Sequence, residues 1–327
     1  MPLIAIEEHW GSLAATDAVR ALPPGRFDPS LAFDEMGDNL GRLHDLGDGR
    51  IAAMDEQGID LSIVSLAPPG TQPLDAKDAV PLSRDANDHV AEAVRRHPTR
   101  LRAFSTLPMA DPDAAVAELE RTAGLGFVGV MLYGRVGETP LDDPRHEPVL
   151  AAAAALRQPV FVHPQVPTPA VRQAQYSGID PTTDLALATF GWGWHLEAGL
   201  AALRLIARGT FDRHPDLQLV LGHWGELLLF WLGRADSLSR VAGLERRVSD
   251  YVRSNVHVTS SGMLDPALLH HALAVTTPDR LLFSTDYPFQ RPTRADIGTF
   301  LAELPSDVDR ELFTAGNARA LFGLTGP

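Results

Sequence analysis

The sequence contains no cysteine and a single lysine among its 327 residues. Without cysteine the chain has no disulfide bond, no thiol nucleophile and no zinc site built on thiolates. The lysine, Lys77, lies among aspartate and proline residues in an expected loop, which excludes a Schiff-base mechanism that depends on a buried lysine. The lack of disulfides is compatible with the cytoplasm, and we expect the protein to be located there.

Positive charge is also scarce. The chain has 28 Lys and Arg residues against 42 Asp and Glu residues, which gives a formal net charge of −14. Such a surface repels polyanions, so we expect neither nucleic acid nor an anionic membrane as a partner. Residues 1–10 do not combine a basic segment with a long apolar run, and we expect no signal peptide and no membrane span. The hydrophobic content of 45% is sufficient for a large core.

Short apolar segments alternate with helical stretches along the whole chain, which predicts parallel strands joined by right-handed crossovers. Eight strands of this kind predict an α/β fold, a closed (β/α)8 or TIM barrel, that forms one domain over residues 1–327. A doubly wound open sheet is the alternative, but no glycine-rich phosphate loop follows the first strand. The expected strands are 3–6, 61–66, 101–107, 127–132, 159–162, 217–221, 256–260 and 281–283.

The segments between these strands have two characters. Some keep the apolar spacing of an amphipathic helix. Two others, 10–45 and 164–190, are long, and we expect them to be loops that cover the mouth of the barrel. The expected helices are 50–57, 84–96, 113–122, 146–156 and 196–211.

Acids and histidines stand where four of the expected strands end. The C-terminal ends of barrel strands meet at one face, where barrel enzymes carry their chemistry. Two carboxylates and two or three imidazoles at this face make a plausible site for a divalent metal. The residues are Glu7, His9, His163, His223, Glu226 and Asp286.

Each of these residues alone has a plainer interpretation. Glu7 and His9 could form a charged strand end that faces solvent. His163 could be a hydrogen-bonded core residue, and Asp286 could cap a following helix. Their common register at strand ends favours a shared site, because residues i and i+2 of a strand, such as Glu7 and His9, point to the same face. The residue between them, Glu8, would then point outward.

Several short motifs, in order along the chain, carry a family resemblance. They are Glu7-Glu8-His9, residues 126–129, residues 141–144, Val162-His163-Pro164, residues 221–226, residues 283–289 and Asn317-Ala318-Arg319. Together they resemble the amidohydrolase-related, metal-dependent decarboxylases, and in particular the γ-resorcylate (2,6-dihydroxybenzoate) and 5-carboxyvanillate decarboxylases. The aminocarboxymuconate semialdehyde decarboxylases are similar at a greater distance.

The resemblance implies a (β/α)8 barrel that holds one divalent metal ion, manganese or zinc, and no organic cofactor. A ligand set that contains carboxylates is compatible with manganese as well as with zinc. Many binuclear relatives bridge two metals with a carboxylated lysine at the end of strand four, and residues 131–134 contain no lysine. The positions that match the family's metal ligands are Glu7, His9, His163 and Asp286.

The resemblance also implies the chemistry. Asp286 would deliver a proton to the ring carbon of a hydroxylated aromatic acid, with His223 and Glu226 assisting, and CO2 would leave without any redox step. Arg234, eleven residues after His223, matches a substrate-contacting arginine. Relatives are commonly homodimers or homotetramers, and we expect such an assembly here.

Two departures concern the substrate pocket. The resembled enzymes carry asparagine at the positions of Tyr133 and Met263, so we expect a pocket of different polarity around Tyr133. Trp194, beside His195 at the start of a helix, is expected to line the ligand pocket with its aromatic ring. The identity of the aromatic acid is not predicted.

Three functions compete at this stage. The first is the metal-dependent decarboxylase. The second is a hydrolase or hydratase of the same superfamily, which would use metal-activated water. The third is a binding protein that kept the barrel without catalysis, which the cost of maintaining polar groups at the mouth disfavours. Release of CO2, as opposed to consumption of water, separates the first two.

Overall fold

The computed structural model of the protein describes residues 1–324. Its main sheet contains eight parallel strands that follow one another in chain order. All eight strands overlap the predicted segments. They are β1 (Ile4–Trp10), β2 (Leu61–Leu66), β3 (Leu101–Thr106), β4 (Gly129–Tyr133), β7 (Val160–His163), β8 (Leu219–Leu221), β9 (Val256–Thr259) and β10 (Leu281–Leu282).

The sheet closes on itself between β1 and the segment that follows β10. The amide of Ile6 donates to the carbonyl of Phe283 at 3.2 Å, and the amide of His9 donates to the carbonyl of Tyr287 at 2.7 Å. Glu8 and Tyr287 form a parallel bridge. The predicted (β/α)8 barrel is therefore confirmed, and the open-sheet alternative is wrong.

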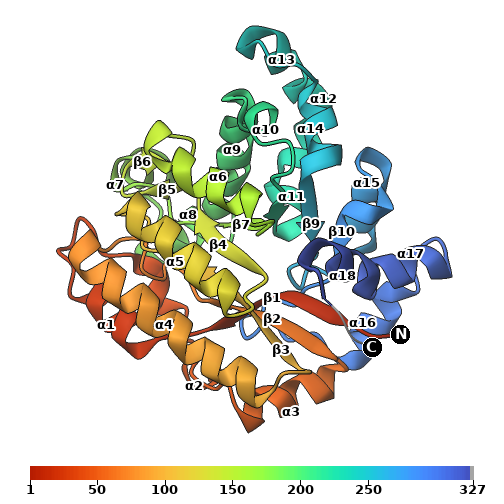
Figure 1. Ribbon diagram of the computed structural model, residues 1–327, viewed down its shortest axis with the longest axis horizontal. Helices are drawn as coiled ribbons and strands as arrows, with labels where there is room; N and C mark the ends of the chain where they lie inside the picture. Colours follow the sequence, from red (N-terminus) through yellow and green to blue (C-terminus); the bar gives the residue numbers. More distant parts are fainter. Residues whose placement is uncertain (325–327) are drawn as a thin grey trace.

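Helices surround the strands (Figure 1). The helices predicted between strands are present, although α4 begins well before residue 84. The helix predicted over 196–211 ends at Ala207, and a second helix, α10, begins after Gly209, which has a φ of 70°. The helices near these strands are α3 (Asp48–Gln57), α4 (Ala76–Arg96), α5 (Pro112–Gly124), α6 (Glu147–Ala155), α9 (Gly193–Ala207), α10 (Thr210–Arg213), α14 (Val248–Asn255), α15 (Pro266–Val275), α16 (Arg294–Leu301), α17 (Asp307–Glu311) and α18 (Asn317–Phe322).

The two segments predicted as loops contain helices of their own. Segment 10–45 contains α1 (Leu13–Arg20) and α2 (Asn39–Leu43), and segment 164–190 contains α7 (Pro169–Val171) and α8 (Pro181–Ala188). The expectation of unstructured loops was therefore wrong. The expectation that they cover the mouth is confirmed, because both segments line the cavity above the strand ends. A hairpin of β5 (Arg135–Val136) and β6 (Thr139–Pro140) was not predicted.

The barrel interior is apolar at the end away from the mouth. Ile4 and Ile6 of β1 pack there with Phe104, and Phe322 of α18 packs against the same cluster. The strand register shifts in β1 between Ala5 and Glu8, which marks a β-bulge. The bulge places an extra residue in β1, so Glu7 faces the barrel axis although Ile6 does so as well.

The remaining short helices lie at the mouth side. The left-handed turn α11 (His223–Glu226) follows β8 and leads to α12 (Leu232–Ala235) and α13 (Ser237–Ala242). Figure 1 shows α12 and α13 projecting away from the barrel. Among residues 1–324, no helix combines the length and the apolar character needed to cross a membrane.

Candidate metal centre and active site

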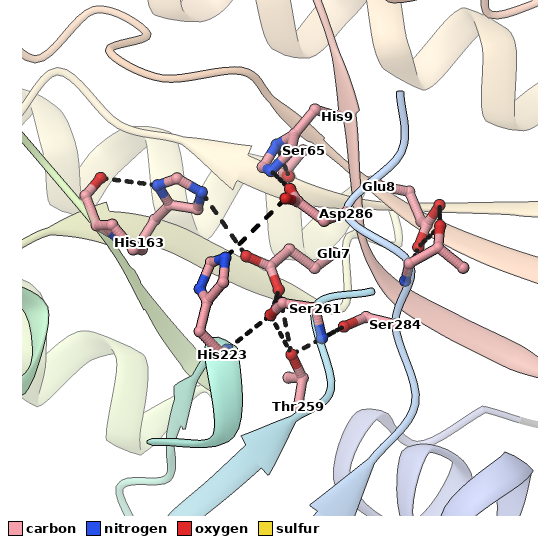
Figure 2. A network of polar contacts seen from close by, with 12 residues as sticks. Glu7, Glu8, His9, Ser65, His163, His223, Thr259, Ser261, Ser284 and Asp286 are labelled. Carbon is pink, nitrogen blue, oxygen red and sulfur yellow. Dashed lines mark hydrogen bonds and ion pairs between the residues drawn. The ribbon is translucent and has the colours of Figure 1, made fainter. Parts of the chain in front are cut away.

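The four predicted metal ligands come together at the C-terminal ends of the strands. Figure 2 shows the side chains of Glu7, His9, His163 and Asp286 pointing toward a common space. One possible ligand atom from each of Glu7, His9 and His163 lies within 4.8 Å of the others. Asp286 joins them through its Oδ1 atom, 3.2 Å from His9 Nε2.

Glu7 is fully buried, and its two oxygens have different surroundings. Oε2 accepts hydrogen bonds from the hydroxyls of Ser261 and Thr259. Oε1 lies 3.7 Å from His163 Nε2 and has no hydrogen-bond partner among the described residues. One oxygen is thus held by the protein, and the other faces the common space.

The two histidines each direct one ring nitrogen into that space. The Nδ1 atom of His163 lies 2.8 Å from the carbonyl oxygen of Pro164. Since a carbonyl only accepts, Nδ1 carries the hydrogen and Nε2 keeps its lone pair. His9 Nδ1 lies 3.2 Å from the hydroxyl of Ser65. Burial, followed by the charge of Arg50, lowers the pKa of His9 to about 3, so its imidazole is neutral and able to bind a metal.

The carboxylates of this cluster need a positive charge nearby. Burial raises the pKa of Glu7 above its ordinary value, and the neighbouring Asp286 carboxylate adds to the effect. Burial also raises the pKa of Asp286, with a further contribution from Glu226. Glu7 is fully buried and the Asp286 side chain is 15% exposed, and carboxylates so removed from water are costly without a cation. A divalent ion would remove that cost, and a set of two imidazoles and two carboxylates suits zinc or manganese.

Glu8 does not face this cluster, as expected from its place in β1. It is buried nevertheless, and its carboxylate accepts from the backbone amide of Thr285 at 2.9 Å and from the hydroxyl of the same residue. Burial raises the pKa of Glu8 to about 8. Glu8 therefore ties β1 to the strand end that carries Asp286.

His223 and Glu226 stand beside the predicted metal ligands. His223 Nδ1 lies 2.8 Å from Glu226 Oε1, and His223 Nε2 lies 4.0 Å from Asp286 Oδ2. Although burial opposes it, the Glu226 carboxylate raises the pKa of His223, with Glu7 and Asp286 adding to the effect. Burial alone would raise the pKa of Glu226, but the charge of His223 and the hydrogen bonds from His195 and His223 together lower it. Glu226 thus holds His223 beside Asp286.

A left-handed stretch of backbone produces this arrangement. Residues 223–227 all have positive φ angles, between 45° and 86°. Only glycine adopts such angles without cost, so the strain at the other four positions must be compensated by the packing around them. Gly222 precedes the turn, and a Cβ atom there would lie 2.9 Å from Ser261 Oγ and 3.1 Å from Glu7 Oε1. A side chain at position 222 would therefore push on the ligand Glu7.

A cavity of about 600 Å³ opens above the cluster. Its polar floor contains His9, His163, His223 and Asp286. Its walls are mostly apolar, with aromatic rings among them, and both mouth-covering segments contribute. The wall residues include Phe33, Met36, Phe190, Trp192, Trp194, Met263 and Phe289.

Trp194 lines this cavity as predicted, with its ring centroid 5.9 Å from that of Phe33. Tyr133 does not line it. It is buried behind His163, to which it is paired in the strand register, with their ring centroids 5.8 Å apart. Arg234 does not line it either, because its side chain is exposed on α12.

Sequence reasoning missed several residues of the site. Ser261 and Thr259 hold Glu7, and hydroxyl residues near strand ends give no distinctive pattern. Asp34 also lines the cavity and is buried, and burial raises its pKa to about 7. His195 was considered only as a neighbour of tryptophans, yet its Nδ1 atom lies 2.7 Å from Glu226 Oε2.

Comparisons with known proteins identify relatives that match the whole chain. The γ-resorcylate decarboxylase of Rhizobium radiobacter is 36% identical over 99% of this chain and 98% of its own. The crystal structure of 5-carboxyvanillate decarboxylase from Sphingomonas paucimobilis superposes with a TM-score of 0.90 at 31% identity, covering 99% of both chains.

A third relative was crystallised with a metal. This dihydroxybenzoic acid decarboxylase from a Polaromonas species, with bound manganese and the inhibitor 2-nitroresorcinol, has a TM-score of 0.84 and 33% identity, covering 100% of this chain and 98% of its own. The Amidohydrolase family matches residues 24–324. The chain belongs to the amidohydrolase family, and its relatives over the full chain include carboxy-lyases that act on hydroxylated benzoates.

Proposed function

We propose that this protein is a metal-dependent, non-oxidative decarboxylase of a hydroxylated benzoate. The observation that carries the proposal is the position of Asp286, whose carboxyl group faces His9 on one side and His223 on the other at the floor of an aromatic cavity. A flat aromatic acid suits such walls. The hydrolase or hydratase alternative is not favoured, since curated relatives that match 98–99% of the chain are γ-resorcylate decarboxylases.

The ion would be held by Glu7, His9, His163 and Asp286. A divalent metal in this position supplies Lewis acidity and stabilises negative charge on the substrate. We propose manganese, the ion in the Polaromonas relative, with zinc as the alternative that the same ligand set accepts. No organic cofactor is part of the proposal.

The residues of the chain divide the work as follows. Asp286 donates a proton to the ring carbon that bears the carboxylate. The bond between that carbon and the carboxylate then breaks, its electron pair returns to the ring, and CO2 leaves. His223, held by Glu226, lies close enough to Asp286 to assist the proton movement.

Substrate binding would depend on three residues that act in different ways. Trp194 offers its ring from the cavity wall. Tyr133 acts from behind His163, where it fixes the shape of the floor. Arg234 matches the position of a substrate-binding arginine, and because it is exposed in the single chain, a second copy of the chain would bring its guanidinium to a substrate carboxylate. A homodimer or homotetramer is therefore part of the proposal.

The proposal is tested with a panel of acids. Protein loaded with manganese is incubated with 2,6-dihydroxybenzoate, 5-carboxyvanillate and other hydroxybenzoates, and CO2 and the matching phenol are measured. In D2O the product is expected to carry one deuterium on the carbon that bore the carboxylate. Incorporation of solvent oxygen without release of CO2 would reject the decarboxylase and favour the hydrolase.

Metal content is measured on the same preparation. We expect about one equivalent of a divalent ion per chain, bound by Glu7, His9, His163 and Asp286. Two equivalents, or full retention of the ion after replacing both His163 and Asp286 by alanine, would contradict the proposed ligand set.

A further inference from the structure

Glu226 is held by two histidines and not by one. Its Oε1 atom faces His223 Nδ1 at 2.8 Å, and its Oε2 atom faces His195 Nδ1 at 2.7 Å. Glu226 is 1% exposed, and no other side chain of residues 1–324 donates to it. Each oxygen of this carboxylate therefore depends on one imidazole.

His195 is itself fixed at both ring nitrogens. Its Nε2 atom lies 3.0 Å from the carbonyl oxygen of Phe190. A carbonyl oxygen only accepts, so Nε2 carries a hydrogen, and the short contact to Glu226 is a hydrogen bond only if a proton also lies between Nδ1 and Oε2. His195 thus bridges the segment that covers the mouth to the buried carboxylate. The ring centroids of His195 and His223 are 4.7 Å apart.

The two hydrogen bonds fix the plane of the Glu226 carboxylate. With only His223 as a partner, the carboxylate could rotate and leave the other oxygen buried and unpaired, which is costly. With both partners, one orientation satisfies both oxygens. That orientation directs the imidazole of His223 so that its Nε2 atom faces Asp286.

We infer that His195 is a positioning residue of the reaction, acting through Glu226 to hold His223 opposite Asp286. The inference rests on the proposed decarboxylase function and adds a member to its catalytic machinery. His195 itself does not contact the predicted metal ligands through any hydrogen bond or ion pair of the described residues. Although His195 also lines the cavity, its loss should lower kcat more than it changes KM and should leave metal content unchanged.

Three variants of one position test this. In His195→Ala both hydrogen bonds are lost. In His195→Asn the amide nitrogen can take the place of Nδ1 and keep the bond to Glu226. In His195→Gln the longer side chain reaches the place of Nε2 and keeps the bond to Phe190, without the donor to Glu226.

We expect kcat to fall about 10- to 100-fold in His195→Ala and in His195→Gln, the range typical for a residue that orients a ligand or base. His195→Asn should recover most of the activity. The opposite pattern, in which glutamine restores activity and asparagine does not, would show that His195 serves only to hold the mouth segment, and would overturn the inference. A change confined to KM would also overturn it, by making His195 a substrate contact.

A second measurement does not depend on activity. Hydrogen-bonded imidazole N–H protons give resonances at the low-field end of a proton NMR spectrum, and the two followed here are the Nδ1 protons of His195 and His223, which both point to Glu226. His195→Ala should remove the first and shift the second, whereas a second resonance that does not shift would contradict coupling through Glu226. If the wild type decarboxylates none of the acids, the proposed function fails, and this spectrum still decides whether His195 positions His223. His195, His223 and Glu226 each offer a possible ligand atom within 4.8 Å of the others. A second equivalent of metal in the wild type that is absent from His195→Ala would overturn the inference and assign these residues to a metal site.

Discussion

At the scale of single residues, hydroxyl groups decide which atoms of the site are free. Ser261 and Thr259 occupy one oxygen of Glu7, and the other is left for a metal. The convergence of the expected ligands could be predicted from the sequence, because they stand at strand ends in a common register. The supporting hydroxyls could not, because serine and threonine are frequent near strand ends and only the folded barrel shows which of them meets Glu7.

The first prediction concerns Ser261. Ser261→Ala removes a donor to Glu7 and an acceptor for the backbone amide of His223. We expect the affinity for manganese to fall about 10- to 100-fold, as for other residues that support a metal ligand, measured by titrating metal-free protein. Ser260→Ala is the matched control, because the hydroxyl of Ser260 donates to the carbonyl of Ser284 and not to Glu7. Equal losses in both variants would mean that the effect is one of general packing.

The second prediction concerns Asp286, which would both hold the metal and pass the proton. Asp286→Asn keeps a carbonyl oxygen for the metal but has no carboxyl proton to donate. We expect turnover to fall by at least about 100-fold, typical for the loss of a positioned acid or base, in protein that still contains metal. Turnover is measured together with metal content, and near-normal turnover in the metal-loaded variant would assign the proton to another group.

At the scale of elements, periodicity predicted the strands but not their irregularities. The apolar runs of β1 and β8 were visible, yet the bulge in β1 was not, because Ile6 and Glu7 form no recognisable turn signal. The left-handed turn at residues 223–227 was also missed, since four of its five residues are not glycine. Both irregularities aim a side chain at the metal site. Local sequence preference predicts regular structure, and these exceptions are enforced by tertiary packing.

The third prediction concerns the first residues of β9, which lie at the end of the barrel away from the site. His257 is buried, and its Nε2 atom lies 3.1 Å from Arg280 Nη1, which can only donate. Burial, followed by the charge of Arg280, lowers the pKa of His257 from 6.5 to about 3. The unfolded chain therefore binds a proton at this residue between pH 6.5 and 3, and the folded protein does not.

Stability that His257 contributes is thus present above pH 6.5 and is lost as the pH falls toward 3. At pH 5.5 the loss relative to pH 8 is about 1 kcal/mol. In His257→Gln, whose amide oxygen can accept from Arg280, this part of the pH dependence should disappear. Urea unfolding of both proteins at the two pH values measures the difference. An equal pH dependence in both proteins would show that His257 binds its proton equally in the folded and unfolded states.

At the scale of the whole molecule, acidic charge and exposed apolar surface are unevenly distributed. The net charge of −14 keeps copies of the chain apart in general. Against this, the segment 230–241, which projects from the barrel in Figure 1, exposes Phe230, Trp231 and Val241 to 50%, 71% and 81%. Large apolar side chains gathered in one projecting segment are typical of an interface. Arg234 lies in the same segment.

The fourth prediction is that this segment joins copies of the chain and that assembly supports substrate binding. Trp231→Glu places a charge in the proposed interface, and we expect a monomer by light scattering where the wild type is a dimer or tetramer. Val308→Glu is the matched control, because Val308 of α17 is 70% exposed but lies outside the segment.

Arg234→Lys should raise KM with little change in kcat, since lysine cannot form the two-pronged contact of a guanidinium with a carboxylate. If Arg234 reaches the substrate of a neighbouring copy, Trp231→Glu will raise KM in the same way. A monomeric Trp231→Glu variant with an unchanged KM would contradict that role for Arg234, and a monomeric wild type would contradict the interface itself.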